Sequence, residues 1–172
     1  MNRAIFLDRD GVLNRVRPGD YVKSPAELEL LPGVAEAVSA LRDAGFLAVL
    51  ISNQQGIGKG LFTQADLDSV TEALQAKVPL DAVYYCPHLK SEGCPCRKPK
   101  PGLIRTAVMD HQIDVSRSVM IGDSFSDLQA ARVASIGLFI RVGEGNSWPE
   151  APDRDTPDLP GAAAWILTRG SA

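Results

Sequence analysis

The sequence is poor in long apolar runs, in excess positive charge and in cysteine. No apolar run approaches the roughly 20 residues that a membrane-spanning helix needs. The net charge of −3 gives no basic surface for nucleic acid, so we expect neither a membrane nor a nucleic-acid partner. The 3 cysteines are an odd number and are clustered, which argues against a disulfide framework. Residues 1–3 also lack the pattern of a signal peptide, and we expect a protein of the reducing cytoplasm.

The 172 residues, 45% of them hydrophobic, are enough for one globular domain with a sizeable core. Short apolar runs typical of strands occupy residues 4–7, 46–51, 82–85, 118–121 and 138–142. Helical patterns alternate with them at residues 34–44, 64–77, from 102 onward, at 127–133 and at 162–168. This alternation predicts a Rossmann-like α/β fold, with a parallel sheet and helices on both faces. The proline-rich stretch at 143–160 predicts an irregular surface crossing, and no second domain is expected in residues 1–172.

Carboxylates gather where two of these strands end. Asp8 and Asp10 close the first strand in the order Asp-Arg-Asp-Gly, and Asp123 closes the strand at 118–121. In open α/β sheets, ligands bind in the crevice outside the carboxyl ends of the strands. Clustered carboxylates repel each other unless a cation joins them, and Mg²⁺ prefers hard oxygen ligands. We therefore expect a Mg²⁺ site at this edge of the sheet.

Three more polar residues belong to the same predicted crevice. Ser52 ends the strand at 46–51, Lys98 lies shortly before the helix that follows Gly102, and Asp127 comes four residues after Asp123. Carboxylates, Mg²⁺ and a lysine are the groups that hold a phosphoryl group during its transfer. Asp127 has a second interpretation, because an Asp in the first turn of a helix is often only a favourable partner of the helix dipole.

A second cluster holds every cysteine of the chain and one of its two histidines. Cys86, His88, Cys94 and Cys96 follow the spacing C-x-H-x₅-C-x-C, which predicts a closed Cys₃His zinc site in a loop at about 86–96. Four protein ligands leave no open position, so the zinc would be structural and would stiffen the loop that carries Lys98. The alternative is a set of loop thiols beside a solvated histidine.

In order and spacing, four segments resemble the four motifs of the haloacid dehalogenase superfamily. The segments are Asp8-x-Asp10-Gly11, Ser52-Asn53, Lys98 and Gly122-Asp123-x₃-Asp127, and the resemblance spans residues 5 to about 131. It implies Mg²⁺-dependent phosphoryl transfer through an aspartyl-phosphate. The length of the chain adds the expectation of a capless form of this fold, because the roughly 20 residues between Asp10 and the helix at 34–44 are too few for a cap domain.

The resemblance also implies a role for each motif residue. Asp8 would be the nucleophile, and Asp10 would first protonate the leaving alkoxide and then take a proton from the hydrolytic water. Asp8, the main-chain carbonyl of Asp10 and Asp123 would ligate Mg²⁺. The resemblance further implies that Ser52 and Lys98 would bind the phosphoryl oxygens and that Asp127 would orient Lys98.

Within the superfamily, the zinc loop and the segments that flank it resemble the heptose bisphosphate phosphatases. The matching segments are C-x-H…C-x-C-R-K-P-x-P-G at 86–102, S-N-Q-x-G at 52–56 and G-D-Y-V at 19–22. Members of this group remove the 7-phosphate of D-glycero-D-manno-heptose 1,7-bisphosphate, a small phosphorylated sugar. The histidinol-phosphate phosphatases carry a similar zinc loop and are the alternative. The substrate contacts that the resemblance implies are Asp20, Tyr21, Val22, Asn53, Gln54 and Arg97.

One position departs from this pattern, since Ser124 stands where some members have a basic residue. Arg97, Lys59 or another residue would then have to supply the charge for a distal phosphate. Two functions of other classes also use some of these features. A receiver-type phosphoacceptor pairs clustered Asp with Lys, but it needs neither a second carboxylate as acid nor a zinc loop. A non-enzymatic zinc-bearing module would not need residues at all four motifs. We predict a monomeric enzyme.

Overall fold

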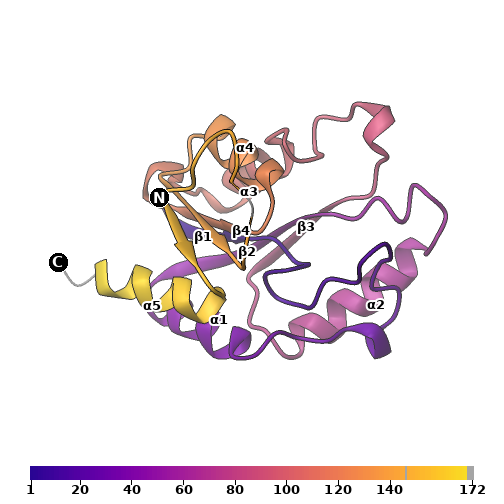
Figure 1. Ribbon diagram of the computed structural model, residues 1–172, viewed down its shortest axis with the longest axis horizontal. Coiled ribbons are helices and arrows are strands. Elements are labelled where there is room, and N and C mark those ends of the chain that lie inside the picture. The colour runs from indigo at the N-terminus through magenta and orange to yellow at the C-terminus, as the bar shows by residue number, and fades with distance from the viewer. Residues whose placement is uncertain (146, 170–172) are drawn as a thin grey trace.

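The computed structural model describes residues 1–145 and 147–169 and arranges six strands of this part of the chain in one parallel sheet (Figure 1). The strand order across the sheet is β3-β2-β1-β4-β5-β6. The strands are β1 (Arg3–Leu7), β2 (Phe46–Asn53), β3 (Ala82–Cys86), β4 (Val119–Gly122), β5 (Leu138–Val142) and β6 (Arg154–Thr156). Because β1 and β4 are central neighbours, the residues that follow them meet at one edge of the sheet.

Helices cover both faces of the sheet (Figure 1). One face carries α1 (Val34–Asp43), α2 (Gln64–Gln75) and α5 (Leu159–Arg169). The other face carries α3 (Gly102–His111) and α4 (Phe125–Val133). Three short 3₁₀ turns lie in the connections of the described residues, at Pro25–Glu27, Lys90–Glu92 and Val115–Arg117.

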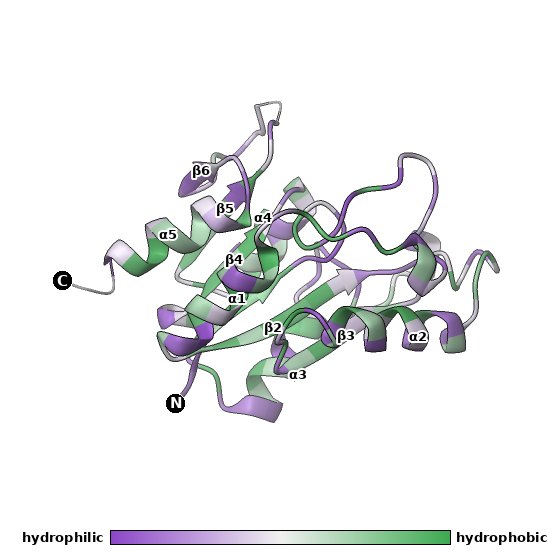
Figure 2. Cartoon of the chain, turned by 90° about the horizontal axis from the view of Figure 1, so that it is seen from below, coloured by the Kyte–Doolittle hydropathy of each residue, from purple (hydrophilic) through white to green (hydrophobic). Residues whose placement is uncertain are grey.

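The two hydrophobic clusters share the central strands, whose side chains alternate between them. In β1, Ile5 and Leu7 pack toward α1, whereas Ala4 and Phe6 pack toward α3 and α4. All four are at most 1% exposed. Strands that are buried on both faces need continuous apolar runs, and Figure 2 shows them in green through the middle of the molecule. The apolar runs of the sequence therefore correspond to the central strands.

The predicted fold class is confirmed, and so is the start of α2. Thr63 accepts a hydrogen bond from the Asp66 amide (3.2 Å), and the Asp66 carboxylate accepts one from the Thr63 amide (2.8 Å). These reciprocal bonds form a capping box. The predicted helix at 127–133 begins two residues earlier, at Phe125, because Ser124 caps it.

The prediction for residues 143–160 is wrong in part, because β6 lies within this stretch and pairs with β5. β6 has only three residues, all of them polar, and the first two are exposed, so it has no apolar pattern to recognise. α5 also begins earlier than expected, at Leu159, with Pro160 in its first turn, where a missing N–H costs no hydrogen bond.

The connection from β1 to α1, residues 8–33, consists of loop and one 3₁₀ turn and contains no α-helix. Among residues 1–145 and 147–169, no helix has the length and apolar character required to cross a membrane.

Candidate active site

Three carboxylates meet where β1 and β4 end. Asp8 follows β1 directly, Asp123 follows β4 directly, and Asp127 comes from the first turn of α4. Their oxygens all lie within 4.8 Å of one another. The predicted convergence of these three residues is therefore present in the structure.

Gly11 allows the loop after β1 to approach the loop after β4. A Cβ at this position would lie 2.0 Å from Oδ2 of Asp123, and the residue has a φ of +85°. Other side chains are disfavoured by this conformation and would displace the Asp123 carboxylate. The glycine of the Asp-Arg-Asp-Gly segment is thus required by a close contact.

Lys98 is the cation at the centre of the carboxylates. Its Nζ lies 2.9 Å from Asp8 and 2.6 Å from Asp127, and it also donates a hydrogen bond to the Ile51 carbonyl (2.9 Å). The side chain is 3% exposed. Burial alone would lower the pKa of Lys98, but the charges of Asp127 and Asp8 outweigh it and raise the pKa above its ordinary value. Lys98 is therefore a fixed positive charge in this crevice.

The carboxylates remain short of positive charge even with Lys98 present. Burial raises the pKa of Asp8 to about 6, although Lys98 opposes the shift. Burial, followed by the charges of Asp8 and Asp127, raises the pKa of Asp123 to about 7. A divalent cation between Asp8 and Asp123 would relieve this repulsion, and the donors are the hard oxygens that Mg²⁺ prefers. The residues present therefore fit the predicted Mg²⁺ site.

Asp10 has different partners from Asp8. Its carboxylate accepts hydrogen bonds from Asn14 Nδ2 (2.9 Å), from Gln54 Nε2 (2.9 Å) and from Arg9 Nη2 (3.2 Å). Its side chain is 32% exposed, whereas Arg9, Asn14 and Gln54 are each 0% exposed. Three buried donors thus bind the Asp10 carboxylate, while part of its side chain remains exposed.

Asp127 makes both of the contacts considered for it. Its carboxylate accepts hydrogen bonds from the Ser124 hydroxyl (2.7 Å) and amide (3.2 Å), which completes a capping box at the start of α4. The other oxygen pairs with Lys98. The same side chain therefore caps the helix and faces the cation.

Ser52 and Asn53 stand at the end of β2. Ser52 is 2% exposed and accepts a hydrogen bond from Gln54 Nε2 (3.1 Å). Asn53 binds the main chain of Lys98 in both directions, accepting from its amide (3.0 Å) and donating to its carbonyl (3.1 Å). Asn53 therefore fixes the loop on which Lys98 is presented.

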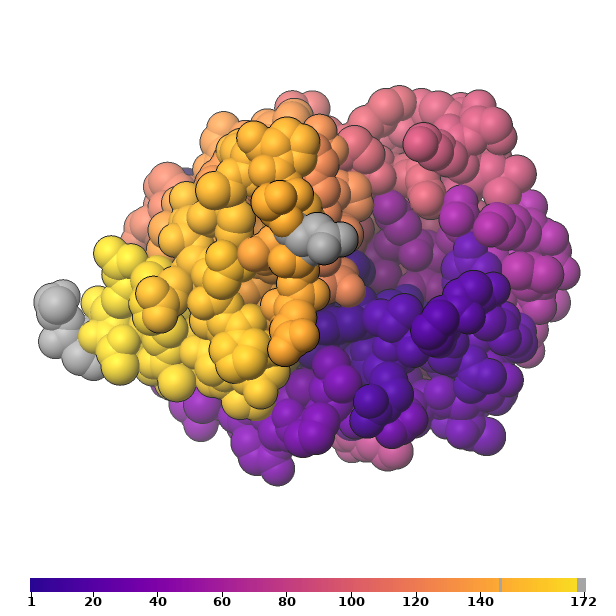
Figure 3. All heavy atoms as spheres, in the orientation of Figure 1, coloured from indigo at the N-terminus to yellow at the C-terminus, as the bar shows by residue number. Residues whose placement is uncertain are grey.

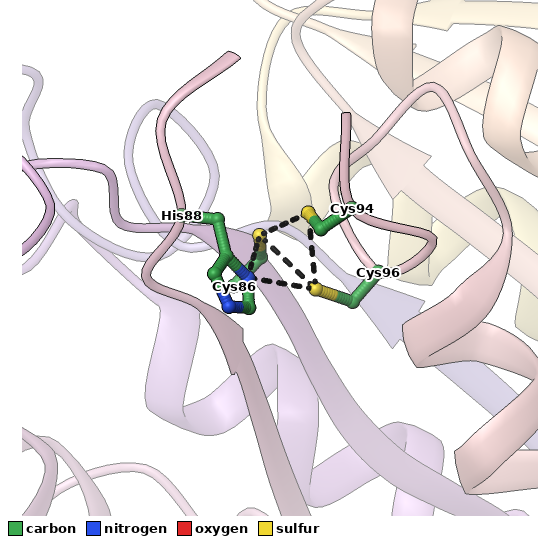
Figure 4. Close-up of side chains that lie close together, drawn as sticks. All are labelled: Cys86, His88, Cys94 and Cys96. Atoms are coloured by element: carbon green, nitrogen blue, oxygen red, sulfur yellow. Dashed lines mark hydrogen bonds between the residues drawn. The ribbon is translucent and has the colours of Figure 1, made fainter. Parts of the chain in front are cut away.

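The four predicted zinc ligands come together in one cluster (Figure 4). The contacts among the three Sγ atoms and Nδ1 of His88 range from 3.2 to 3.6 Å. These separations are close to the edges of about 3.5–3.8 Å that tetrahedral zinc with sulfur and nitrogen ligands requires. The three cysteines are free thiols, and this donor set can hold Zn²⁺ with no open position.

A cavity of about 370 Å³ extends from Lys98 along the zinc loop. The surface is hollowed where this loop, the loop after β1 and the region of α4 meet (Figure 3). The cavity is lined by Asn53, Lys90, Gly93, Cys94, Arg97, Lys98, Pro99, Lys100 and Ser126. Four of these residues are cationic, which suits a ligand with a second anionic group.

The three residues of the predicted substrate loop at 20–22 differ in their exposure to solvent. Asp20 is exposed and pairs with Lys23 (2.5 Å), and the ring of Tyr21 packs on Phe62 with 5.8 Å between centroids. Val22 is 1% exposed and belongs to the hydrophobic core, so it anchors the loop from below. The structure does not bring Val22 or Gln54 to the surface of the crevice.

Two buried residues around Asp10 were not predicted from the sequence. Arg9 lies between the two motif carboxylates, and Asn14 lies four residues after Asp10. The sequence signal for Arg9 is its position inside the motif, but nothing in the sequence indicates that it is buried. Asn14 gives no sequence signal that separates it from an ordinary turn residue.

The chain is similar to known proteins over almost its whole length. A family model described as haloacid dehalogenase-like hydrolase matches residues 3–135. D-glycero-beta-D-manno-heptose-1,7-bisphosphate 7-phosphatase of Escherichia coli O6:H1 is 39% identical over 95% of this chain and 88% of the relative. D-glycero-D-manno-heptose-1,7-bisphosphate 7-phosphatase of Thermosynechococcus vestitus is 39% identical over 96% and 95%. Among solved structures, D,D-heptose 1,7-bisphosphate phosphatase from B. bronchiseptica, complexed with magnesium and phosphate, aligns with a TM-score of 0.86 and 34% identity, over 97% of this chain and 99% of that chain.

Proposed function

Because the chain belongs to the haloacid dehalogenase-like hydrolase family, we propose that it is a Mg²⁺-dependent phosphatase that removes the 7-phosphate of D-glycero-D-manno-heptose 1,7-bisphosphate. The observation that carries the proposal is the ion pair of Asp8 with buried Lys98 beside Asp123. This arrangement places a carboxylate nucleophile, a fixed cation and a metal ligand at one sheet edge.

In the first step, a carboxylate oxygen of Asp8 attacks the phosphorus of the 7-phosphate. The bond between phosphorus and the C7 oxygen breaks, and Asp10 gives its proton to the leaving alkoxide. Lys98 and Ser52 hold the phosphoryl oxygens during the transfer. The products are the heptose 1-phosphate and an aspartyl-phosphate on Asp8.

In the second step, water attacks the phosphorus of the aspartyl-phosphate. Asp10, now a carboxylate, takes the proton of the water, and the bond between phosphorus and the Asp8 oxygen breaks. Inorganic phosphate leaves, and both carboxyl groups return to their starting states. One residue thus serves as acid and then as base.

Asp8, Asp123 and the main-chain carbonyl of Asp10 are the proposed ligands of Mg²⁺. When bound, the ion offsets the charge of the carboxylates and of the phosphoryl group. The magnesium and phosphate named for the B. bronchiseptica structure support this assignment. The zinc of the Cys₃His site is proposed to be structural, because the cluster leaves no open position.

Substrate selectivity is proposed to depend on the cavity next to Lys98. Arg97 lines this cavity. Its guanidinium would bind the distal phosphate and so supply the positive charge that Ser124 lacks. Asn53 also lines this cavity, and Asp20 and Tyr21 are exposed enough to reach the sugar from the opposite loop. Lys59 stands over the Tyr21 ring at 5.5 Å and adds positive charge there.

We further propose that residues 1–172 form one phosphatase domain and act as a cytoplasmic monomer without nucleic-acid or membrane partners. All the proposed catalytic residues come from one chain, so a second copy is not required. The free thiols, arranged as metal ligands, suit a reducing compartment.

The experiment that tests the substrate is phosphate release with Mg²⁺ from both anomers of the heptose bisphosphate and from histidinol phosphate. We expect the kcat/KM for one heptose anomer to exceed that for histidinol phosphate by about 100-fold or more, since a site built for polar groups rejects ligands that leave those groups unpaired. A preference for histidinol phosphate would contradict the substrate and leave the catalytic assignments in place.

A further inference from the structure

Gln54 is completely buried, and both atoms of its side-chain amide are occupied. Its Oε1 accepts from Arg9 Nη2 (3.1 Å), and its Nε2 donates to Asp10 (2.9 Å) and Ser52 (3.1 Å). A residue with 0% exposure and no free amide atom has no group to offer a substrate. Its partners are instead the proposed acid–base residue and a proposed phosphoryl ligand.

Arg9 determines which way this amide faces. Its guanidinium is 0% exposed and can only donate hydrogen bonds. Nη2 contacts Gln54 and Asp10, and the Tyr85 ring stands 5.9 Å from the guanidinium carbon. If the amide were reversed, its NH₂ would face the guanidinium and its oxygen would face the Asp10 carboxylate. Both contacts would then be repulsive, so Arg9 fixes the NH₂ group toward Asp10.

This orientation has a second consequence, at Ser52. Because Nε2 of Gln54 donates to the Ser52 oxygen, one lone pair of that oxygen is occupied. The hydroxyl proton must then point elsewhere, and it remains available for an acceptor such as a phosphoryl oxygen. The same amide group therefore contacts the proposed acid–base residue and one of the two proposed phosphoryl ligands.

We propose that Arg9 and Gln54 are positioning residues, and that together they hold the Asp10 carboxylate for proton transfer to the leaving group. The proposal rests on the proposed function, because Asp10 matters only if it serves as acid and base. It replaces the expectation that Gln54 contacts substrate. Asn14 donates to Oδ1 of Asp10, whereas Gln54 donates to Oδ2. About a third of the Asp10 side chain stays exposed for the reaction.

The primary test is Gln54→Leu, with Gln129→Leu on the exposed face of α4 as matched control. We expect kcat for the heptose bisphosphate to fall about 100-fold, the scale of a 1 Å misplacement of a catalytic group, with KM changed less than about threefold. A raised KM with an unchanged kcat would overturn the proposal, because it is the result for a substrate contact. The control should match the wild type.

A second substrate distinguishes a misplaced Asp10 from a disturbance of the other catalytic residues. The leaving group of 4-nitrophenyl phosphate departs without a proton, so its first step does not need Asp10. We expect Gln54→Leu to give a burst of nitrophenolate at nearly the wild-type rate, followed by slow turnover. An equal loss in the burst would mean that Asp8, Ser52 or Lys98 was disturbed, and would overturn the proposal that Gln54 acts through Asp10.

A double-mutant cycle tests whether Gln54 acts through Asp10. In an Asp10→Asn background, adding Gln54→Leu should lower kcat by less than about threefold, because the group it positions is already absent. A further loss of about 100-fold would show an independent role and contradict the proposal.

A second variant tests the proposal if Gln54→Leu folds poorly, and a crystal structure tests it if the heptose is not the substrate. Gln54→Glu keeps the volume and the acceptor for Arg9 but removes the donor to Asp10, and it should show the same loss of kcat. A crystal structure of either variant should show the Asp10 carboxylate displaced. An unmoved carboxylate would overturn the positioning proposal, whereas an inactive wild type would overturn only the proposed substrate.

Discussion

At the scale of single residues, the site depends on a cation that is removed from water. Lys98 is 3% exposed and lies between Asp8 and Asp127, so each charge is tolerated because the others are present. Removing one partner of a buried ion pair leaves an uncompensated charge. The same contacts that place Lys98 for its proposed role in phosphoryl binding therefore also stabilise the fold.

We expect Lys98→Met to lower the free energy of unfolding by about 3–5 kcal/mol, because it leaves two buried carboxylates without their cation. Denaturant unfolding in Mg²⁺-free buffer measures this change. The control, Lys77→Met at an exposed position, should change it by less than about 0.5 kcal/mol. Adding Asp127→Asn to Lys98→Met should recover part of the loss. If Lys98→Met costs no more than the control, the buried pair does not stabilise the protein.

Asp123 should behave in the opposite way, since burial raises its pKa to about 7. At pH 8 its charge is unfavourable in the folded, Mg²⁺-free protein, so Asp123→Asn should raise the melting temperature there. The difference should shrink as the pH falls, and the two proteins should melt together only below the ordinary pKa of 3.8, where the carboxyl group is protonated in both the folded and the unfolded state. Scanning calorimetry with and without Mg²⁺ checks this, and the variant should also lose the stabilisation by Mg²⁺. A lower melting temperature at pH 8 would contradict the account.

The candidate residues of the crevice could be predicted because they follow strands directly. Asp8, Ser52 and Asp123 each come immediately after or at the end of an apolar run, and parallel strands bring such positions together. Arg9 could not be predicted in the same way. Its burial depends on Gln54, 45 residues away in the sequence, and no local pattern expresses that contact.

At the scale of elements, the zinc loop connects β3 to Arg97 and Lys98, the cations proposed to bind phosphate. Cys96 ends the ligand set, and Arg97 and Lys98 follow it without a spacer. A metal held by both ends of the loop would restrict the backbone from which these two cations extend. The loop is therefore expected to lose order when one ligand is removed.

We expect Cys94→Ser to lose zinc, to speed amide hydrogen exchange in residues 87–101 and to lower kcat/KM by about 10-fold or more, because the misplaced cations then bind phosphate poorly. Metal analysis, hydrogen exchange and phosphate release measure the three effects. Ser91→Ala, at an exposed position of the same loop, is the control. Full activity of zinc-free Cys94→Ser would show that the metal does not support the site.

Elements with a strong local signal were predictable, and those that depend on their neighbours were not. β2 is a continuous apolar run, and α2 begins with a capping box that is written in four residues. β6 has three polar residues and is a strand because β5 offers it an edge. The backbone pairing of β6 with β5, and not the pattern of its side chains, makes this segment a strand.

At the scale of the whole molecule, the site opposes the stability of the fold at neutral pH. Asp8 and Asp123 have folded-state pKa values of about 6 and about 7, above the ordinary value of 3.8. A carboxyl group whose pKa is raised on folding favours the folded state at low pH, and this contribution is lost as the pH rises through the folded-state pKa.

The Mg²⁺-free wild type should therefore become less stable between pH 5 and pH 8. Mg²⁺ should stabilise it more at pH 8 than at pH 5, because the ion binds the ionised carboxylates. Thermal melting across this range, with zinc retained, tests both statements. Stability that rises from pH 5 to pH 8 without Mg²⁺ would contradict the placement of the two carboxyl groups.

The measurement that tests the central claim most directly is phosphorus NMR of D-glycero-D-manno-heptose 1,7-bisphosphate during turnover with Mg²⁺. We predict that the signal of the 7-phosphate disappears as inorganic phosphate grows, while the anomeric 1-phosphate signal remains at full intensity. Asp8→Asn, with its fold intact, should leave both signals unchanged. Loss of the anomeric phosphate, or turnover by Asp8→Asn at the wild-type rate, would contradict the account.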